Sequence, residues 1–89
     1  MTILEEPMPV VFDGKRDVKN YSRLDWFAKI LEEVHEAMTA PDDKLAEELT
    51  DIITVCTSFL ESLGYDRDIR ANMFLNVNDK NARRGYLER

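Results

Sequence analysis

LAEELTDIITVCTSFLESL, residues 45–63, repeats apolar side chains in steps of four and three. The repeating positions are Leu45, Leu49, Ile52, Cys56, Phe59 and Leu63. This spacing is typical of one side of a helix that packs in a bundle. Asp42 and Asp43 precede it, where acidic residues favour a helix N-terminus, and Gly64 follows, where glycine ends helices in a left-handed conformation. We therefore predict a long helix that begins behind Asp43 and ends near Leu63.

The segment before this helix shows the same period. Its apolar positions are Phe27, Leu31, Val34 and Met38. Ser22 can cap the start of a helix, and Asp25, three residues later, can bond back to it as in a capping box. Ala40-Pro41 ends this helix. The pattern predicts a helix over 23–39. Because the connection to the next helix is short, the two helices should form an antiparallel hairpin.

A third, shorter helix is predicted after Asp66. It should end between Asn78 and Arg84, with Gly85 beyond it. The fold class expected for the domain over 21–89 is therefore all-α, an antiparallel helical hairpin plus a short third helix.

Residues 1–20 show no helical period and form a predicted N-terminal arm. Pro7 and Pro9 interrupt the chain, Val10-Val11-Phe12 can form a short extended piece, and Asp13-Gly14 is typical of a turn. We expect this arm to be ordered only where it packs on the helices or on another subunit.

Composition restricts the partners of this chain. Its 89 residues fit one domain, and its net charge of −6 disfavours a nucleic acid polymer as partner. No apolar stretch approaches the roughly 18 residues needed to span a bilayer, and the first six residues do not resemble a signal peptide. The single cysteine, Cys56, cannot form an intrachain disulfide. We expect a soluble cytoplasmic protein with no membrane partner.

A second, weaker apolar stripe lies beside the first on the helix over 23–39. It consists of Trp26, Ile30 and Ala37. It borders Glu33, and Val55 borders Glu48 on the other helix. A chain this short that exposes such a stripe gains from association, so we expect a homodimer or tetramer in which hairpins form a four-helix bundle. Trp26 can belong to the core, to this interface or to a surface on which a base stacks, and we take the interface as the default. Cys56 lies on the apolar stripe, so core packing is the simpler interpretation for it than catalysis.

Two acidic motifs carry the chemistry: Glu32-Glu33-Val34-His35-Glu36, and then Glu48-Leu49-Thr50-Asp51. Glu33 and Glu36 are three residues apart, as are Glu48 and Asp51, so each pair occupies neighbouring turns of one helix face. Four converging carboxylates repel each other unless a cation lies between them. Ligands that are all oxygen suit Mg²⁺, or Mn²⁺, better than zinc or copper.

Helical angles place these acids around the apolar stripes. Glu48 falls just beside the stripe on its helix, with Asp51 farther round the same flank. Glu33 flanks the stripe that contains Leu31, whereas Glu36 points nearly away from that stripe.

His35 offers a different metal chemistry. Glu32 and His35 have the ExxH spacing of di-iron carboxylate bundles, and a homodimer would supply two copies. The helical angle turns His35 toward the side of Leu31, where a buried, hydrogen-bonded imidazole is the simpler interpretation. The HExxH zinc motif is absent because its second histidine position is Thr39.

Taken together, these residues resemble the MazG-type all-α nucleoside triphosphate pyrophosphohydrolases. That superfamily also includes dimeric dUTPases and phosphoribosyl-ATP pyrophosphohydrolases. Its signature of EExxE, a spacer and ExxD is matched by the two acidic motifs, with an eleven-residue spacer over 37–47. Lys80-Asn81 and Arg84-Gly85-Tyr86 resemble the phosphate-binding segment that follows in small members. The resemblance covers about residues 22–86, and His35 replaces a glycine that is often found in the first motif.

The resemblance implies a role for each motif. The four carboxylates that would hold Mg²⁺ are Glu33, Glu36, Glu48 and Asp51. Glu32 would help to position or deprotonate the attacking water, while Lys80, Asn81 and Arg84 would bind phosphates. Hydrolysis between the α- and β-phosphates of a nucleoside triphosphate would then release the monophosphate and pyrophosphate. The biological role that the resemblance implies is nucleotide-pool housecleaning, the hydrolysis of unwanted nucleoside triphosphates.

A further inference follows from the resemblance. Larger relatives carry an additional helix that lines the base pocket, and little helix precedes Ser22 here, so the arm or a second subunit must hold the base.

The competing hypothesis is a non-catalytic acidic helical module that dimerises and binds a protein partner. Mg²⁺ affinity separates the two, because scattered surface acids bind Mg²⁺ negligibly.

Overall fold

The computed structural model describes residues 5–88; residues 1–4 of the predicted arm and Arg89 lie outside the described residues. Three α-helices dominate it: α1 (Arg23–Thr39), α2 (Leu45–Ser62) and α3 (Arg67–Arg83). Two short 3-10 helices, η1 (Val18–Asn20) and η2 (Asp42–Lys44), precede α1 and α2. Within 5–88 the only β-pairing is an isolated bridge between Phe12 and Asp17. The all-α prediction is confirmed.

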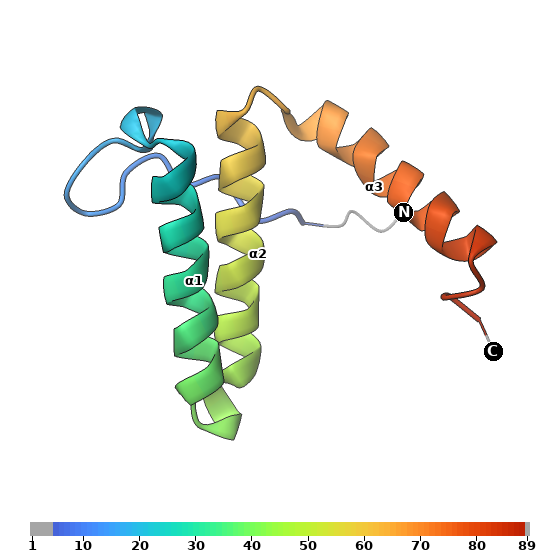
Figure 1. Cartoon of the computed structure of the whole chain (residues 1–89), viewed down its shortest axis with the longest axis horizontal. Coiled ribbons are helices and arrows are strands. Elements are labelled where there is room, and N and C mark those ends of the chain that lie inside the picture. The colour runs from blue at the N-terminus through green and yellow to red at the C-terminus, as the bar shows by residue number, and fades with distance from the viewer. Residues whose placement is uncertain (1–4, 89) are drawn as a thin grey trace.

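α1 begins and ends where its local sequence predicts. The Asp25 amide donates to Ser22 Oγ at 3.2 Å, and the Ser22 amide donates back to Asp25 Oδ2 at 2.8 Å, which completes a capping box. The helix stops at Thr39, ahead of Pro41. A short connection through η2 then brings α2 back along α1, and the two helices pack as a hairpin (Figure 1).

α2 ends at Ser62, and Gly64 just beyond it has a φ of +95°, the left-handed conformation that glycine adopts at low cost. α3 begins at Arg67, behind Asp66, whose carboxylate accepts from the Ile69 amide at 3.0 Å. The prediction of a short third helix is wrong, since α3 has 17 residues and equals α1 in length. Caps at both ends, Asp66 and Gly85 (φ +75°), sustain it despite asparagines of low helix propensity. α3 diverges from the hairpin (Figure 1).

The residues that pack between α1 and α2 differ from the predicted core. Trp26, Ala37 and Val55 are the buried apolar residues, and Trp26 is only 3% exposed. Its ring stacks on Phe59, with centroids 5.4 Å apart, and meets Tyr21 edge-on at 4.7 Å. The assignment of Trp26 to a subunit interface is therefore wrong. The stripe that sequence analysis left exposed is the one that packs within the chain.

The stripe that was predicted to form the core lies largely at the surface. Leu31 is 66% exposed and Met38 is 79% exposed. Other exposed members of the two stripes are Phe27, Leu45, Leu49, Cys56 and Leu63. Phe27, Cys56 and Leu63 share an apolar cavity of about 480 Å³ between the two helices. The core assignment of Cys56 is wrong, and so is the prediction of a buried His35, whose side chain is exposed.

The arm packs on the hairpin and on α3. The Val10 amide donates to Ser58 Oγ on α2 at 2.9 Å. Arg70 of α3 is buried and binds the carboxylates of Glu6 and Glu61, and it donates to the Tyr65 carbonyl at 2.7 Å. This buried guanidinium joins the arm, the end of α2 and α3, and two carboxylates offset its charge. None of the helices within 5–88 combines the length and the apolar character needed to cross a membrane.

Candidate functional site

Three carboxylates converge near the turn that joins α1 to α2. Glu33 and Glu36 come from α1 and Glu48 comes from α2, and one oxygen of each lies within 4.8 Å of the others. Glu36 was predicted to point away from the stripe that contains Leu31, and it does lie in the cluster while that stripe is exposed. The reason is that α1 packs through Trp26 and Ala37, so its Glu33–Glu36 face turns toward α2.

Glu33 is buried and Glu48 is half-buried, so both carboxylates are partly removed from water. Glu33 is 9% exposed, and Oε2 of both residues is buried with no hydrogen-bond partner among the described residues. Burial raises the pKa of Glu33, and the neighbouring Glu36 carboxyl adds to that rise. Burial also raises the pKa of Glu48, again assisted by the charge of Glu36. Buried acceptors that lack donors are costly, so this arrangement calls for a positive group at that point.

Asp51 lies beside this trio rather than within it. It is exposed, and it lines a cavity together with Glu33. Its negative charge contributes to the raised pKa values of both Glu33 and Glu48, which places it within electrostatic reach of the cluster. The structure therefore brings three of the four predicted ligands together and leaves the fourth at the edge.

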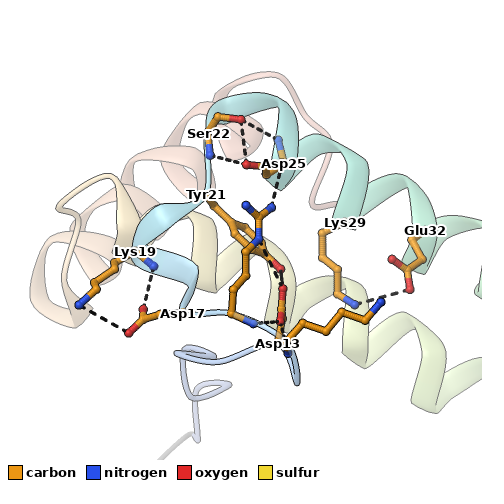
Figure 2. A network of polar contacts seen from close by, with 10 residues as sticks. Asp13, Asp17, Lys19, Tyr21, Ser22, Asp25, Lys29 and Glu32 are labelled. Atoms are coloured by element: carbon orange, nitrogen blue, oxygen red, sulfur yellow. Dashed lines mark hydrogen bonds and ion pairs between the residues drawn. The ribbon is translucent and has the colours of Figure 1, made fainter.

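Glu32 is not one of the three converging carboxylates but is connected to them through a cation. Lys29 Nζ lies 3.6 Å from Glu32 Oε1 (Figure 2), and it also lies 3.6 Å from Glu33 Oε1. Lys29 is a site residue that sequence reasoning missed. Its spacing to Glu32 and Glu33, three and four residues, is the usual signal for a helical ion pair and could have found it.

The predicted phosphate-binding residues lie on another part of the molecule. Lys80 and Asn81 belong to the last turn of α3, and Arg84 follows it, with its guanidinium 6.0 Å from the centre of the Tyr86 ring. The carboxylates lie near the α1–α2 turn, whereas α3 starts at the opposite end of α2 and diverges (Figure 1). Within one chain, these three residues are not brought to the carboxylates.

A cavity of about 320 Å³ adjoins the carboxylates, between the arm and the hairpin. Among the residues that line it, those of the hairpin are Trp26, Lys29, Glu33, Asp51, Thr54, Val55 and Ser58. The arm contributes Val10, Phe12, Asp13, Val18 and Tyr21. The arm was predicted as a candidate wall of a base pocket and Trp26 as a possible stacking surface for a base, and both line this cavity. Apart from these, Glu33 and Asp51, the lining residues were not assigned to a site from the sequence. They lie far apart in the sequence and carry no common spacing.

A polar network fixes the arm beside this cavity. Tyr21 Oη donates to Asp13 Oδ2 at 2.5 Å, and the Lys15 and Arg16 amides donate to Asp13 Oδ1 (Figure 2). The Tyr21 hydroxyl, helped by these amides, lowers the pKa of Asp13 to about 2, while Asp13 raises the pKa of Tyr21 to about 12. Arg16 then reaches Asp25 of α1 at 3.0 Å and covers the Tyr21 ring.

The donor set fits a hard divalent cation. All three converging groups are carboxylates, and two of their oxygens are buried without hydrogen-bond partners in the described part of the chain. Carboxylate oxygens are preferred by Mg²⁺ and Mn²⁺, and a cation there would relieve the repulsion that raises the pKa values of Glu33 and Glu48. Lys29 alone does not satisfy both buried oxygens, since it contacts Oε1 of Glu33.

Comparisons with protein-family models, with curated proteins and with solved structures found no match to this chain.

Proposed function

We propose that this chain is a Mg²⁺-dependent nucleoside triphosphate pyrophosphohydrolase that acts as a homodimer or tetramer. The observation that supports the proposal most is the pair of buried carboxylate oxygens without hydrogen-bond partners on Glu33 and Glu48, two residues whose carboxylates converge with that of Glu36. A solvated acidic surface would not bury its charges in this way. The sequence resemblance to MazG-type enzymes supplies the reaction.

In the proposed site, Glu33, Glu36 and Glu48 hold the cation, and Asp51 completes the set from the edge of the cluster. When bound, Mg²⁺ supplies positive charge that polarises a phosphoryl oxygen and binds the triphosphate. Mn²⁺ has the same ligand preference and could replace it.

Glu32 is the proposed base. Its carboxylate is open to solvent and shares Lys29 with Glu33, so it can accept a proton from water beside the cluster. Water oxygen attacks the α-phosphorus, and the bond from that phosphorus to the bridging oxygen breaks. The bridging oxygen leaves with the β-phosphate, which yields a nucleoside monophosphate and pyrophosphate.

Lys29 is suited to neutralise charge during this step. Its ammonium group already lies between two carboxylates at the edge of the cavity, and it needs only a small side-chain movement to meet a phosphate oxygen. A charge-assisted contact to a phosphate is stronger than one between neutral groups.

The proposed assembly covers the exposed apolar face of the hairpin, which we define as Phe27, Leu31, Met38, Leu45, Leu49, Cys56 and Leu63. An uncovered apolar face of this extent is typical of an association surface. A second hairpin packed on this face would make a four-helix bundle, with two apolar stripes meeting two others. Association would also allow Lys80, Asn81 and Arg84 of one subunit to approach the carboxylates of another.

The decisive experiment is to assay pyrophosphate release from a panel of canonical and modified nucleoside triphosphates with Mg²⁺, and to titrate Mg²⁺ by calorimetry. We expect saturable Mg²⁺ binding and release of pyrophosphate with at least one substrate. Glu48→Gln should lose both, since it keeps the shape and removes one negative ligand. Negligible Mg²⁺ binding together with dimerisation would instead favour the non-catalytic interaction module.

A further inference from the structure

The cavity between the arm and the hairpin is lined by two kinds of side chain. The apolar and aromatic ones come from both parts of the chain: Val10, Phe12, Val18, Tyr21, Trp26 and Val55. The polar and charged ones are Asp13, Lys29, Glu33, Asp51, Thr54 and Ser58. Small-molecule sites have this composition, with an apolar body and a few polar groups that fix orientation.

The cavity adjoins the carboxylate cluster. Glu33 belongs to both, and Asp51 lines the cavity while its charge reaches Glu33 and Glu48. A ligand with phosphates at the carboxylates would therefore have its other end directed between the arm and α1. The volume of about 320 Å³ lies at the low end of small-molecule sites and suits a single nucleoside.

The arm forms a fixed wall of this cavity. Ser58 Oγ accepts from the Val10 amide at 2.9 Å, which ties the arm to α2. Asp13 and Tyr21 close the next loop, and Arg16 joins that loop to Asp25 at 3.0 Å (Figure 2). A wall that is held before binding lowers the ordering cost of a ligand.

Polar atoms inside the cavity lining remain open to a ligand. Thr54 Oγ1 donates to the Thr50 carbonyl at 3.1 Å, which leaves its lone pairs free to accept from a base or sugar. Phe12 is one of the apolar residues that line the cavity and is 58% exposed, so its ring can pack against a base. Every nucleobase offers a π-face for such a contact.

We propose that this cavity binds the nucleoside portion of the substrate, with the arm as the wall that contacts the base. The inference rests on the proposed function for the identity of the ligand, but its test does not require catalysis. Phe12 contacts the base, and Thr54 orients the nucleoside by accepting a hydrogen bond.

Trp26 is the only tryptophan in the chain and lines the cavity, so its fluorescence reports on binding there. The experiment titrates the full chain, in EDTA, with AMP, GMP, CMP and UMP, and separately with inorganic tripolyphosphate. We expect at least one monophosphate to change the fluorescence saturably, while tripolyphosphate without metal does not. No change with any monophosphate, or an equal change with tripolyphosphate, would overturn the inference.

Three variants complete this test. Phe12→Ala should weaken monophosphate binding roughly five- to hundredfold, the range set by loss of one aromatic–base contact. Phe12→Tyr keeps an aromatic ring and should bind as the unmodified protein does, which separates loss of contact from loss of folding. Met8→Ala is the matched control, because Met8 lies in the same arm, is exposed and does not line the cavity. Equal binding by Phe12→Ala and Met8→Ala would overturn the role of the arm.

The same proteins distinguish this inference from the proposed function. Monophosphate binding that Phe12→Ala weakens, without any triphosphate hydrolysis, would support the cavity and reject the enzyme. Triphosphate hydrolysis with an unchanged KM in Phe12→Ala would support the enzyme and reject the cavity. A raised KM with little change in kcat or in Mg²⁺ affinity would support both.

Discussion

The two faces of the α1–α2 hairpin contrast in what they expose. The face under the arm buries Glu33, a carboxylate, and places it beside Trp26 and Val55. The exposed apolar face leaves Leu31 and Met38 largely open to water. A monomer designed for solubility would have the opposite arrangement. One face therefore buries charge and the other exposes apolar surface. In the proposed function a cation would bind the first face and a second hairpin would cover the second.

Removing a carboxylate on the buried face should have the largest effect. We expect Glu33→Gln to lower kcat/KM roughly a hundredfold or more, because the site loses one negative ligand. Without metal, the same variant should melt at a higher temperature than the unmodified protein, since it removes a buried charge that lies beside the Glu36 carboxylate. Activity assays and thermal melts in EDTA measure both effects. Unchanged turnover at limiting Mg²⁺ would show that Glu33 is not a ligand.

Placing a charge on the exposed apolar face should disrupt association. We expect Leu31→Asp to raise the dimer dissociation constant about a hundredfold, because the interface would bury an unpaired carboxylate. Met8→Asp makes the same kind of change in the arm, away from this face, and should leave the dimer intact. Light scattering across a dilution series measures both. If the unmodified chain is a monomer at tens of micromolar with full activity, the apolar face is not a subunit interface.

A smaller effect is expected from the basic residues around the end of α3. Lys80→Met or Arg84→Met should each lower kcat/KM roughly tenfold to a hundredfold, by loss of a charge-assisted hydrogen bond, with Mg²⁺ binding to the free protein almost unchanged. Arg83→Met is the control, since adjacent helical residues point about 100° apart. Equal losses at Arg83 and Arg84 would indicate a general charge effect.

Mixing subunits tests where these cations act. If Lys80 of one subunit acts at the carboxylates of another, each mixed dimer of Glu48→Gln with Lys80→Met contains one intact site. An equal mixture of the two variants should then recover to about a quarter of the activity of the unmodified protein. No recovery after subunit exchange would mean that Lys80 does not act across the interface.

The pH dependence of stability should be the smallest and most specific effect. The pKa values of Glu33 and Glu48 are raised from the ordinary 4.5, so the folded protein holds these protons more tightly than the unfolded chain does. Their stabilisation is fully present below 4.5 and is lost as pH rises through the raised values. Asp13, with a pKa lowered to about 2, contributes in the opposite sense, and its contribution is complete above 3.8.

We therefore expect the Tm in EDTA to fall as pH rises from 4.5 toward neutrality. Excess Mg²⁺ should remove that fall, and Glu33→Gln should reduce it. Thermal melts followed by circular dichroism over this range measure the effect. A Tm that rises or stays constant with pH in EDTA would show that burial does not raise the pKa values of these two acids.

Local sequence was sufficient for the helices and their ends. Ser22 with Asp25, Pro41, Gly64 and Asp66 act on the backbone within a few residues, so the start or end of each helix follows from short-range interactions. The acidic spacing also follows from the helical repeat, which keeps Glu33 and Glu36 on one face whatever the helix packs against.

Tertiary structure decided which face of each helix is buried. On α1 the stripe through Trp26 and Ala37 and the stripe through Phe27 and Met38 have the same spacing and differ by one residue, about 100° of rotation. Periodicity cannot choose between them. The stack of Trp26 on Phe59 selects the first, and that rotation turns Glu36 into the carboxylate cluster. The wall of the cavity likewise depends on contacts between the arm and α2. One of these contacts joins Val10 to Ser58, which are 48 residues apart in the sequence, and no sequence pattern connects residues at that separation.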